Sequence, residues 1–384
     1  MKKTTALLLA LALASASRCH PGREAQTQTS ASQGDIPVGF FGALTGGEAA
    51  FGNSTLQGAQ LAVEEINAAG GVLGRKIKLH VEDDQGRAEE AASVATKLIT
   101  STGVVALIGE NSSNQSLAAA PIAQQNKIVM ISPSSTNPRV TQAGDYIFRV
   151  CFTDPYQGKA LATFVRKNLN ATNVAILLDK KNDYSVGLAE FFTKEFEPLG
   201  GKIVAEQSYS GGDTEFRPQL TTIKAAKPQV LFLPGFYTDV GQIAIQARDI
   251  GIEVPFVGGD GWDSPSVIQI GGKSVENSYF SDHYFVGEAR PLVQKFVAEL
   301  RKRHGRTPET NAALGYDAVR LWAEAVKRAG SLDPQKVRDA VAATKNYEGI
   351  SGTITMGPTR DPIKPVAIIR IEGGEMKFEA WVKP

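Results

Sequence analysis

The amino-acid sequence predicts an α/β protein built from two successive lobes. Short apolar runs alternate with amphipathic runs at the pitch of strand–helix units, which is typical of a parallel sheet covered by helices on both faces. The alternation pauses near Asp154 and Pro155 and then begins again. About 350 residues follow the N-terminal region, too many for one ordinary hydrophobic core and suitable for two domains.

The first lobe is expected to alternate four strands with three helices. Leu56, Ala59, Val63 and Ile66 recur at helical spacing in the first helix. Gly70 follows that helix, as a C-terminal glycine should. The predicted strands are residues 37–44, 77–81, 104–108 and 128–131, and the predicted helices are residues 55–69, 91–99 and 116–125.

The second lobe repeats this pattern and is followed by a tail that departs from it. The predicted strands are residues 174–178, 203–207, 230–233 and 256–257, and the predicted helices are residues 186–197, 220–225 and 240–250. The tail is expected to form helices at 292–303, 312–329 and 334–343 and a β-rich end at 352–383. Because this tail must pack somewhere, we expect the chain to return to the first lobe and then to the second. Several passages between lobes make a hinge.

The N-terminus has the order of features found in secretory signal peptides. Lys2 and Lys3 precede an Ala/Leu run at residues 6–14, and residues 14–16 (ASA) offer a small-residue cleavage site. The apolar run is far shorter than the ~20 residues needed to span a bilayer. We therefore expect a signal peptide at residues 1–16 and export to the periplasm.

Residues 17–35 are predicted to be a flexible leader, because Gln, Thr, Ser and Ala dominate them and few side chains could enter a core. Lipidation of Cys19 within this leader is the alternative to simple cleavage, and it would tether the protein to a membrane. Arg18 stands where lipoproteins carry a small residue, so the sequence favours simple cleavage.

Charge and cysteine content exclude several classes of protein. The formal net charge is +1, and removal of Lys2 and Lys3 would give +1 − 2 = −1. A near-neutral chain with interspersed charges has no nucleic-acid or membrane-surface footprint. Two cysteines, Cys19 and Cys151, cannot form a disulfide framework. Cys151 lies in an apolar stretch and is expected to be a small buried residue. We expect a monomer.

The sequence lacks the motifs of catalysis and cofactor binding. Its four histidines are scattered without metal-ligand spacing, and neither HExxH nor GxSxG occurs. Gly272, Lys273 and Ser274 imitate the end of a P-loop, but the earlier glycine that the motif requires falls on Val267. Residues 70–74 (GGVLG) follow a helix and are therefore a turn, not a dinucleotide-binding loop. We expect no cofactor, no metal and no enzymatic activity.

Small polar residues gather after two consecutive strands of the first lobe. Residues 109–113 (GENSS) follow one strand, and residues 132–138 (SPSSTNP) follow the next. Ligands of open α/β sheets bind at the carboxyl ends of strands. Hydroxyls and free N–H groups at helix N-termini suit an anion such as a carboxylate. Helix caps and turns use the same residues, so that interpretation stays open.

The second lobe has matching features after its own strands, in residues 179–184, 235–237 and 258–262 (GGDGW). Asp260 follows a strand between glycines and could pair with an ammonium group, or it could be a turn aspartate. Tyr184, Phe236 and Trp262 could supply apolar walls or be core aromatics.

Five stretches resemble the type I periplasmic binding proteins, and within them the leucine/isoleucine/valine-binding branch that serves ABC importers. These stretches are residues 38–46 (VGFFGALTG), 58–74 (GAQLAVEEINAAGGVLG), 81–84 (VEDD), 131–138 (ISPSSTNP) and 148–158 (FRVCFTDPYQG). The resemblance runs from about Ile36 to the C-terminus and weakens beyond Asp282. It implies two Rossmann-like lobes joined by a three-crossing hinge, with the ligand in the cleft. It also implies lobe 1 at residues 36–154 and 284–360 and lobe 2 at 155–283 and 361–384.

The resemblance further implies roles for individual residues. The ligand carboxylate is held in that family by residues that fall here on Ser113, Ser134, Ser135 and Thr136. The ammonium partner falls on Asp260, and the side-chain pocket falls on Phe51, Tyr156, Tyr184, Phe236 and Trp262. Two departures bear on specificity, because Asp260 replaces a glutamate and Phe236 stands where a tyrosine often occurs.

The expectation is therefore a binding protein that captures a branched-chain aliphatic amino acid and delivers it to a membrane-embedded ABC permease. A sensor of the same fold that binds an amide, urea or another small carboxylate is the alternative, although a ligand without an ammonium group would not need Asp260. An exported enzyme is disfavoured, because no nucleophile, base and orienting group occur together.

Overall fold

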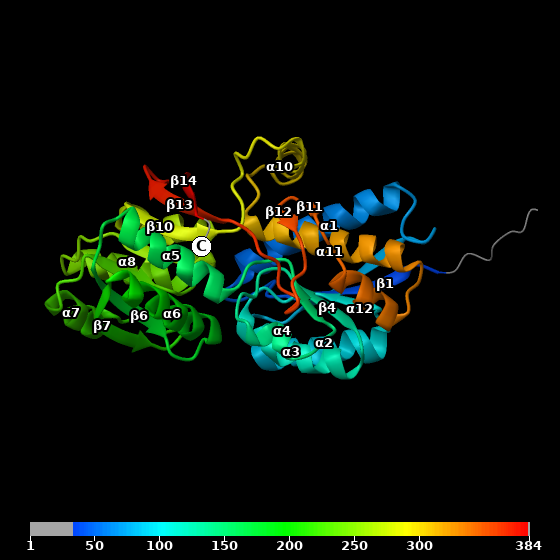
Figure 1. Ribbon diagram of the computed structural model, residues 1–384, viewed down its shortest axis with the longest axis horizontal. Helices are drawn as coiled ribbons and strands as arrows, with labels where there is room; N and C mark the ends of the chain where they lie inside the picture. The colour runs from blue at the N-terminus through cyan, green and yellow to red at the C-terminus, as the bar shows by residue number, and fades with distance from the viewer. Residues whose placement is uncertain (1–33, 383–384) are drawn as a thin grey trace, which may run out of the picture. The chain divides into compact units, whose positions relative to one another are not determined.

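The computed structural model describes residues 34–382. The expected signal peptide and residues 17–33 of the expected leader, including Cys19, lie outside the described residues. Between residues 34 and 382 the chain forms two α/β lobes, each built around one large sheet (Figure 1). The two-lobed α/β arrangement that the sequence predicts is confirmed.

The first lobe contains a parallel sheet in the order β2-β1-β3-β4-β5. Val38 and Phe40 of the first strand enter one hydrophobic core, and Phe41 enters the core on the opposite face, as the alternation of side chains along a strand requires. The strands are β1 (Ile36–Gly42), β2 (Ile77–Asp83), β3 (Ala106–Ile108), β4 (Val129–Ser132) and β5 (Ile147–Arg149).

Seven helices belong to this lobe. Figure 1 shows α11 and α12, in orange, among the blue and cyan elements, and the shared core of α1, α10 and α11 agrees. Helices α1 and α11 pack closely, since a Cβ on Gly58 would lie 1.8 Å from the carbonyl oxygen of Ala312. The helices are α1 (Ala49–Ala68), α2 (Ala88–Lys97) with its π-helical extension η1 (Leu98–Thr102), α3 (Ser113–Gln125), α4 (Arg139–Gln142), α10 (Pro291–His304), α11 (Thr310–Ala329) and α12 (Pro334–Ala342).

The second lobe contains a mixed sheet in the order β14-β13-β10-β9-β8-β6-β7, in which only β13 and β14 are antiparallel to their neighbours. The strands are β6 (Asn173–Asp179), β7 (Lys202–Tyr209), β8 (Val230–Leu233), β9 (Phe256–Gly258), β10 (Ser278–Asp282), β13 (Val366–Glu372) and β14 (Glu375–Val382). The helices are α5 (Asp154–Lys167), α6 (Asp183–Phe196), α7 (Arg217–Ala225), α8 (Tyr237–Asp249) and α9 (Ser266–Gly271), with short 3-10 turns η2 (Glu197–Leu199), η3 (Asp260–Trp262) and η4 (Gly272–Val275).

The chain passes between the lobes three times. The connections are residues 150–153 after β5, residues 283–290 after β10, and residues 355–365 between β12 and β13. A small hairpin, β11 (Tyr347–Gly349) and β12 (Gly352–Ile354), precedes the third connection. Three connections guide the relative motion of two lobes more tightly than one linker can.

Several elements between residues 34 and 382 were not predicted from the sequence, among them the strands β5, β10 and β11 and the helices α4, α5 and α9. The strand β5 has three residues, too few for a visible period. The helix α5 begins at Asp154, with Pro155 in its first turn. The prediction treated that dipeptide as a break, but proline is favoured at the first position of a helix.

Candidate functional site

A cavity lies where loops from both lobes meet, at the carboxyl ends of strands from each sheet. Its walls come from both lobes, and a junction between domains is a common place for a small-molecule site. The first sheet reverses its strand order between β1 and β3, and the loops after β3 and β4 line the cavity, as the switch-point rule expects. The lining residues are Phe51, Asn111, Ser112, Ser113, Ser134, Thr136, Tyr184, Phe236, Asp260, Gly261, Asp263, Asp282, His283, Thr310, Asn311 and Leu314.

On the first lobe, Ser113 and Thr136 present hydroxyl groups to the cavity. Ser113 is the first residue of α3, where backbone N–H groups lack partners within the helix. Its oxygen accepts a hydrogen bond from the Asn137 N–H at 3.2 Å, which leaves the hydroxyl proton free to donate. The Thr136 hydroxyl is buried and makes no well-directed hydrogen bond among the described residues, although it lies close to the buried Asp154 carboxyl group. Both groups can therefore donate to an anion.

Ser134 belongs to a polar network that includes α11. The Asn111 side-chain nitrogen donates to the Ser134 hydroxyl at 3.1 Å and to the Asn311 side-chain oxygen at 2.8 Å. The Ser134 hydroxyl lies 3.0 Å from the same Asn311 oxygen. Sequence reasoning included Asn111 in the polar run at residues 109–113 without giving it a role, and it did not find Asn311, since a lone asparagine carries no motif.

Ser135, whose backbone is one of the two predicted partners of the ligand carboxylate, is not among the residues that line the cavity. Its N–H donates to the Ser132 hydroxyl at 3.0 Å, and its own hydroxyl lies 2.7 Å from that of Ser116. The carbonyl oxygens of Glu110 and Asn111 also lie 3.0 Å from the Ser135 hydroxyl. Ser135 therefore holds the loop together from within.

On the second lobe, Asp260 and His283 form a buried pair. The His283 Nε2 lies 3.0 Å from the Asp260 Oδ2, and the two side chains are 1% and 9% exposed. Burial lowers the pKa of the His283 imidazole, against the opposing effect of Asp260. Because a carboxylate only accepts hydrogen bonds, the proton of the neutral ring belongs on Nε2. The other oxygen, Asp260 Oδ1, makes no well-directed hydrogen bond among the described residues, although the Tyr184 hydroxyl lies close to this carboxylate.

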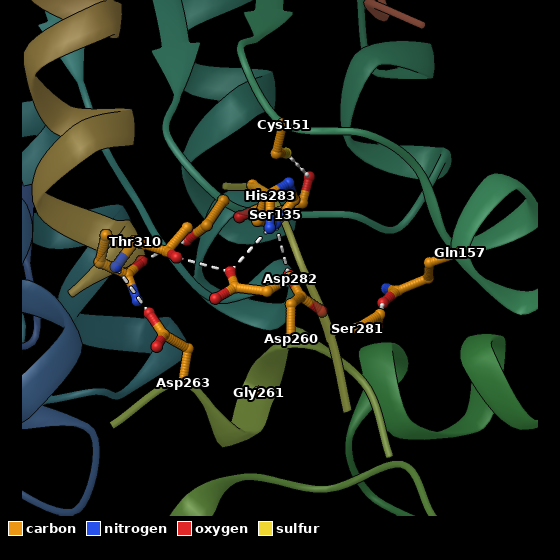
Figure 2. A network of polar contacts seen from close by, with 12 residues as sticks. Ser135, Cys151, Gln157, Asp260, Gly261, Asp263, Ser281, Asp282, His283 and Thr310 are labelled. Atoms are coloured by element: carbon orange, nitrogen blue, oxygen red, sulfur yellow. Dashed lines mark hydrogen bonds and ion pairs between the residues drawn. The ribbon is translucent and has the colours of Figure 1, made fainter. Parts of the chain in front are cut away.

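Further carboxylates stand beside this pair, as Figure 2 shows. The Thr310 hydroxyl donates to Asp282 at 2.6 Å and its N–H donates to Asp263 at 2.7 Å. Burial raises the pKa of Asp263 to about 6 and that of Asp282 well above its usual value. Sequence reasoning missed these two aspartates, His283 and Thr310.

Acidic groups dominate the charge of the cavity wall. Three aspartates line the cavity within residues 34–382, and neither lysine nor arginine does. His283 is held neutral by burial. A buried carboxylate needs a positive partner or hydrogen-bond donors, so this wall favours a ligand that brings a cationic group. The described residues contain no group of His, Cys, Asp or Glu side chains placed to hold a metal ion.

Three aromatic rings close the remaining side of the cavity. Tyr184 and Phe236 are stacked with ring centroids 5.3 Å apart, and Phe51 meets Phe236 edge to face at 5.8 Å. The side chain of Asn182 caps α6 by accepting from the Tyr184 and Ser185 N–H groups, which fixes the start of that helix. Gly259 leaves room for the ring, since a Cβ there would lie 2.3 Å from the Tyr184 hydroxyl.

The predictions for Tyr156 and Trp262 need correction, because neither residue lines the cavity. Trp262 is fully buried, and its ring nitrogen donates to the Leu233 carbonyl at 3.0 Å, inside the core of the second lobe. Tyr156 packs at the edge of the core between α5 and the sheet. Trp262 is therefore a core aromatic, the alternative that sequence reasoning had kept for it, whereas Tyr156 is only partly buried.

Contacts between the lobes bridge both rims of the cavity. At one rim the Tyr237 hydroxyl donates to the Gly47 carbonyl at 2.7 Å. At the other, Asn114 accepts from the Asp183 N–H at 2.8 Å, and the Asn137 side chain donates to the Asp183 carbonyl at 2.8 Å. The structure therefore describes an arrangement in which the two lobes are closed on each other.

Comparisons with known proteins agree with this architecture. A family model described as periplasmic binding protein matches residues 35–375. The Leu/Ile/Val-binding protein homolog 1 of Brucella suis biovar 1 (strain 1330) is 31% identical over 335 residues, which cover 86% of this chain and 88% of that protein.

Two solved structures are also similar. A leucine binding protein from Thermotoga maritima is 38% identical with a TM-score of 0.88, over 91% of this chain and 99% of that one. A branched-chain amino acid transporter substrate binding protein from Streptococcus pneumoniae, in complex with isoleucine, is 35% identical with a TM-score of 0.86, over 91% of this chain and 100% of that one.

Between residues 34 and 382, no helix is both long enough and apolar enough to cross a bilayer. The lobes, the interlobe cavity and the match over residues 35–375 together place the chain in a known group. This chain belongs to the periplasmic binding protein family, with the type I fold of the leucine/isoleucine/valine-binding branch.

Proposed function

We propose that this protein binds an aliphatic α-amino acid between its lobes, in the periplasm, and delivers it to a membrane-embedded ABC permease. One observation carries the proposal. The same cavity holds unpartnered donors on one lobe and an unpartnered carboxylate oxygen on the other. A zwitterion with an adjacent carboxylate and ammonium group complements both.

The first lobe is suited to the ligand carboxylate. The hydroxyls of Ser113 and Thr136 and the free N–H groups at the start of α3 are donors on one side of the cavity. A helix N-terminus favours negative charge through its dipole and its orphan N–H groups. Ser134 is held by Asn311, so its hydroxyl is a secondary partner in this assignment.

The second lobe is suited to the ligand ammonium group. Asp260 Oδ2 is engaged by His283, and Oδ1 is left to accept from a new donor. Because no lysine or arginine lines the cavity within the described chain, the ligand supplies the only cation there. A charge-assisted hydrogen bond of this kind is about twice as strong as a neutral one.

The aromatic side is suited to an aliphatic side chain. Phe51, Phe236 and the ring of Tyr184 offer an apolar surface without a charged group to pair a second ionic end. Relatives are named for leucine, isoleucine and valine, and a related structure holds isoleucine. We therefore place the branched-chain amino acids first among candidate ligands.

Delivery would use the motion of the two lobes. Ligand contacts from both lobes stabilise the closed arrangement, and the three connections supply the hinge. The Lys2–Lys3 and Ala/Leu order of the N-terminus supports export before binding. We propose that the protein acts as a monomer toward the permease.

A calorimetric panel tests the proposal directly. Leucine, isoleucine and valine should bind with 1:1 stoichiometry and more tightly than glutamate or lysine, while benzoate and urea should not bind. Native mass spectrometry of freshly purified protein should reveal an amino acid as co-purified ligand. Binding of urea, an amide or benzoate in place of every amino acid would contradict the proposal and favour a sensor of the same fold.

A further inference from the structure

Three successive backbone carbonyl groups of the loop that carries Thr136 accept hydrogen bonds, and these bonds hold the loop in place. The Ser135 carbonyl accepts a hydrogen bond from the Arg149 side chain, and the Asn137 carbonyl accepts another from Arg149 Nη2 at 2.8 Å. The Thr136 carbonyl between them accepts from the Asp154 N–H at 2.9 Å. With three successive carbonyls fixed, the backbone around Thr136 is held in place, and Thr136 lines the cavity together with Ser134 from the same loop.

Arg149 is a buried cation that reaches beyond this loop. It is the last residue of β5 and is fully buried. Its Nε lies 2.6 Å from Asp361 Oδ1, in a charge contact without a well-directed N–H bond. Thr141 joins the two groups, because its hydroxyl donates to Asp361 at 3.0 Å and accepts from Arg149 at 3.2 Å. Asp361 thus gives the guanidinium its only contacting carboxylate among the described ion pairs.

Asp361 lies on the third connection between the lobes, and neighbouring residues fasten that connection to β5. The Arg360 side chain donates to the Ile147 carbonyl at 3.2 Å and to the Thr141 carbonyl at 2.6 Å. The ammonium group of Lys364 donates to the Val150 carbonyl at 3.0 Å. Residues 360–364 of this connection are therefore bonded at several points to Arg149 and to the chain around it.

We propose that Arg149 is a positioning residue for ligand recognition and that Asp361 couples it to the hinge. Arg149 contacts no part of the cavity lining except through the loop, so its effect on ligand passes through Thr136. The inference rests on the proposed amino-acid function, since Thr136 is assigned there to the ligand carboxylate. Beyond that function, we infer that the third connection influences the orientation of the Thr136 hydroxyl.

A double-mutant cycle with leucine as the probe tests this coupling. Asp361→Asn keeps the shape of the side chain and leaves Arg149 in place without its charge partner. Thr136→Val removes the hydroxyl. We expect Asp361→Asn to weaken leucine binding about threefold or more. The loss of leucine affinity caused by Thr136→Val should be at least about threefold smaller in the Asp361→Asn protein than in wild type. The reason is that substitutions of residues acting through one network are not additive. Additive effects would overturn the proposal.

Asp145→Asn is the matched control. It removes the ion pair of Asp145 with Arg338, which is in the same lobe but outside the cavity. This variant should leave leucine affinity and the effect of Thr136→Val unchanged. Coupling of equal size in the control would show a general loss of stability and would also overturn the proposal.

Hydrogen exchange of the ligand-free protein tests the positioning without depending on the ligand. Asp361→Asn and Arg149→Lys should speed amide exchange at residues 133–138 by about tenfold relative to Asp145→Asn, with global stability measured alongside. Unchanged exchange there would refute the role of Arg149. If wild type binds no amino acid but exchange responds as expected, the proposed function fails and the positioning role stands.

Discussion

Asp260→Asn is the substitution that bears most directly on ligand recognition. It keeps the size of the side chain and removes its charge. The neighbouring His283 ring can still contact residue 260 through Nε2. A ligand ammonium group would then enter a cavity wall whose assigned anionic partner has become a neutral amide.

The expected loss of binding free energy follows from the burial of Asp260. The Asp260 side chain is only 9% exposed, so water cannot replace the lost carboxylate. Asp282 cannot replace it either, because burial raises the pKa of that group and favours its neutral form. Truncating one partner of a buried charge pair costs about 2–5 kcal/mol. We expect about 3–4 kcal/mol here, which is roughly a 140- to 700-fold loss at about 1.4 kcal/mol per tenfold.

Calorimetric titration at pH 7 is the assay, with two ligands. Leucine should show the loss, whereas 4-methylpentanoate, which lacks the ammonium group, should bind the variant at least as well as it binds wild type. Asp249→Asn, which alters an exposed acid paired with Arg217 on the same lobe, should change neither affinity. Leucine binding to Asp260→Asn within about threefold of wild type would refute the ammonium assignment.

Three further predictions concern closure, stability and export. Tyr237→Phe removes two hydrogen bonds at the cavity rim, one to the Gly47 carbonyl and one from the Ala50 N–H. It should weaken leucine and isoleucine equally, by about 5- to 140-fold, since each bond contributes about 0.5–1.5 kcal/mol. Burial raises the pKa of Asp154 to about 7. The folded protein therefore keeps a proton on this group that the unfolded chain loses near pH 4. As a result, the free energy of unfolding falls as pH rises from about 4 to 7. Asp154→Asn should remove that fall and be more stable than wild type by up to about 4 kcal/mol at pH 8 in chemical denaturation without ligand. The intact mass of the secreted protein should match a chain that begins at Ser17.

Each of these predictions has a control or a contrary result. Tyr156→Phe, outside the cavity, should leave affinity unchanged, and a Tyr237→Phe protein with wild-type affinity would exclude a closing role for that hydroxyl. Parallel profiles of unfolding free energy for wild type and Asp154→Asn between pH 4 and 8 would show that the pKa of Asp154 is not raised in the folded protein. A mass that includes a diacylglyceryl group on Cys19 would replace simple cleavage with lipid anchoring.

The fold was predictable because its signals are periodic and long. Apolar residues at helical spacing in α1, and the apolar strands of both sheets, follow from burial of one face or two. Local starts were harder to place. The helix α1 begins at Ala49, six residues before the predicted start. The prediction missed these residues because, apart from Phe51, residues 49–54 have small or polar side chains that show no helical period. The short strand β5 gave no signal at all.

The site was predictable in part, and the limits are geometric. Thr136 and Ser135 are neighbours in one loop, yet only Thr136 reaches the cavity, and sequence cannot tell which way each side chain of a turn points. Trp262 is two residues from Asp260 and turns into the core. Thr310 and Asn311 arrive from α11 on another part of the chain, so only the folded structure brings them to the cavity.

The contacts across the cavity rims can change ligand affinity without changing ligand specificity. Asn114 and Asp183 lie outside the cavity lining, so a change in them alters the balance between open and closed forms and multiplies the affinity for every ligand by the same number. Substitutions at such positions could adapt the protein to richer or poorer surroundings without touching its choice of ligand. Retuning strength would then require no redesign of the recognition surface.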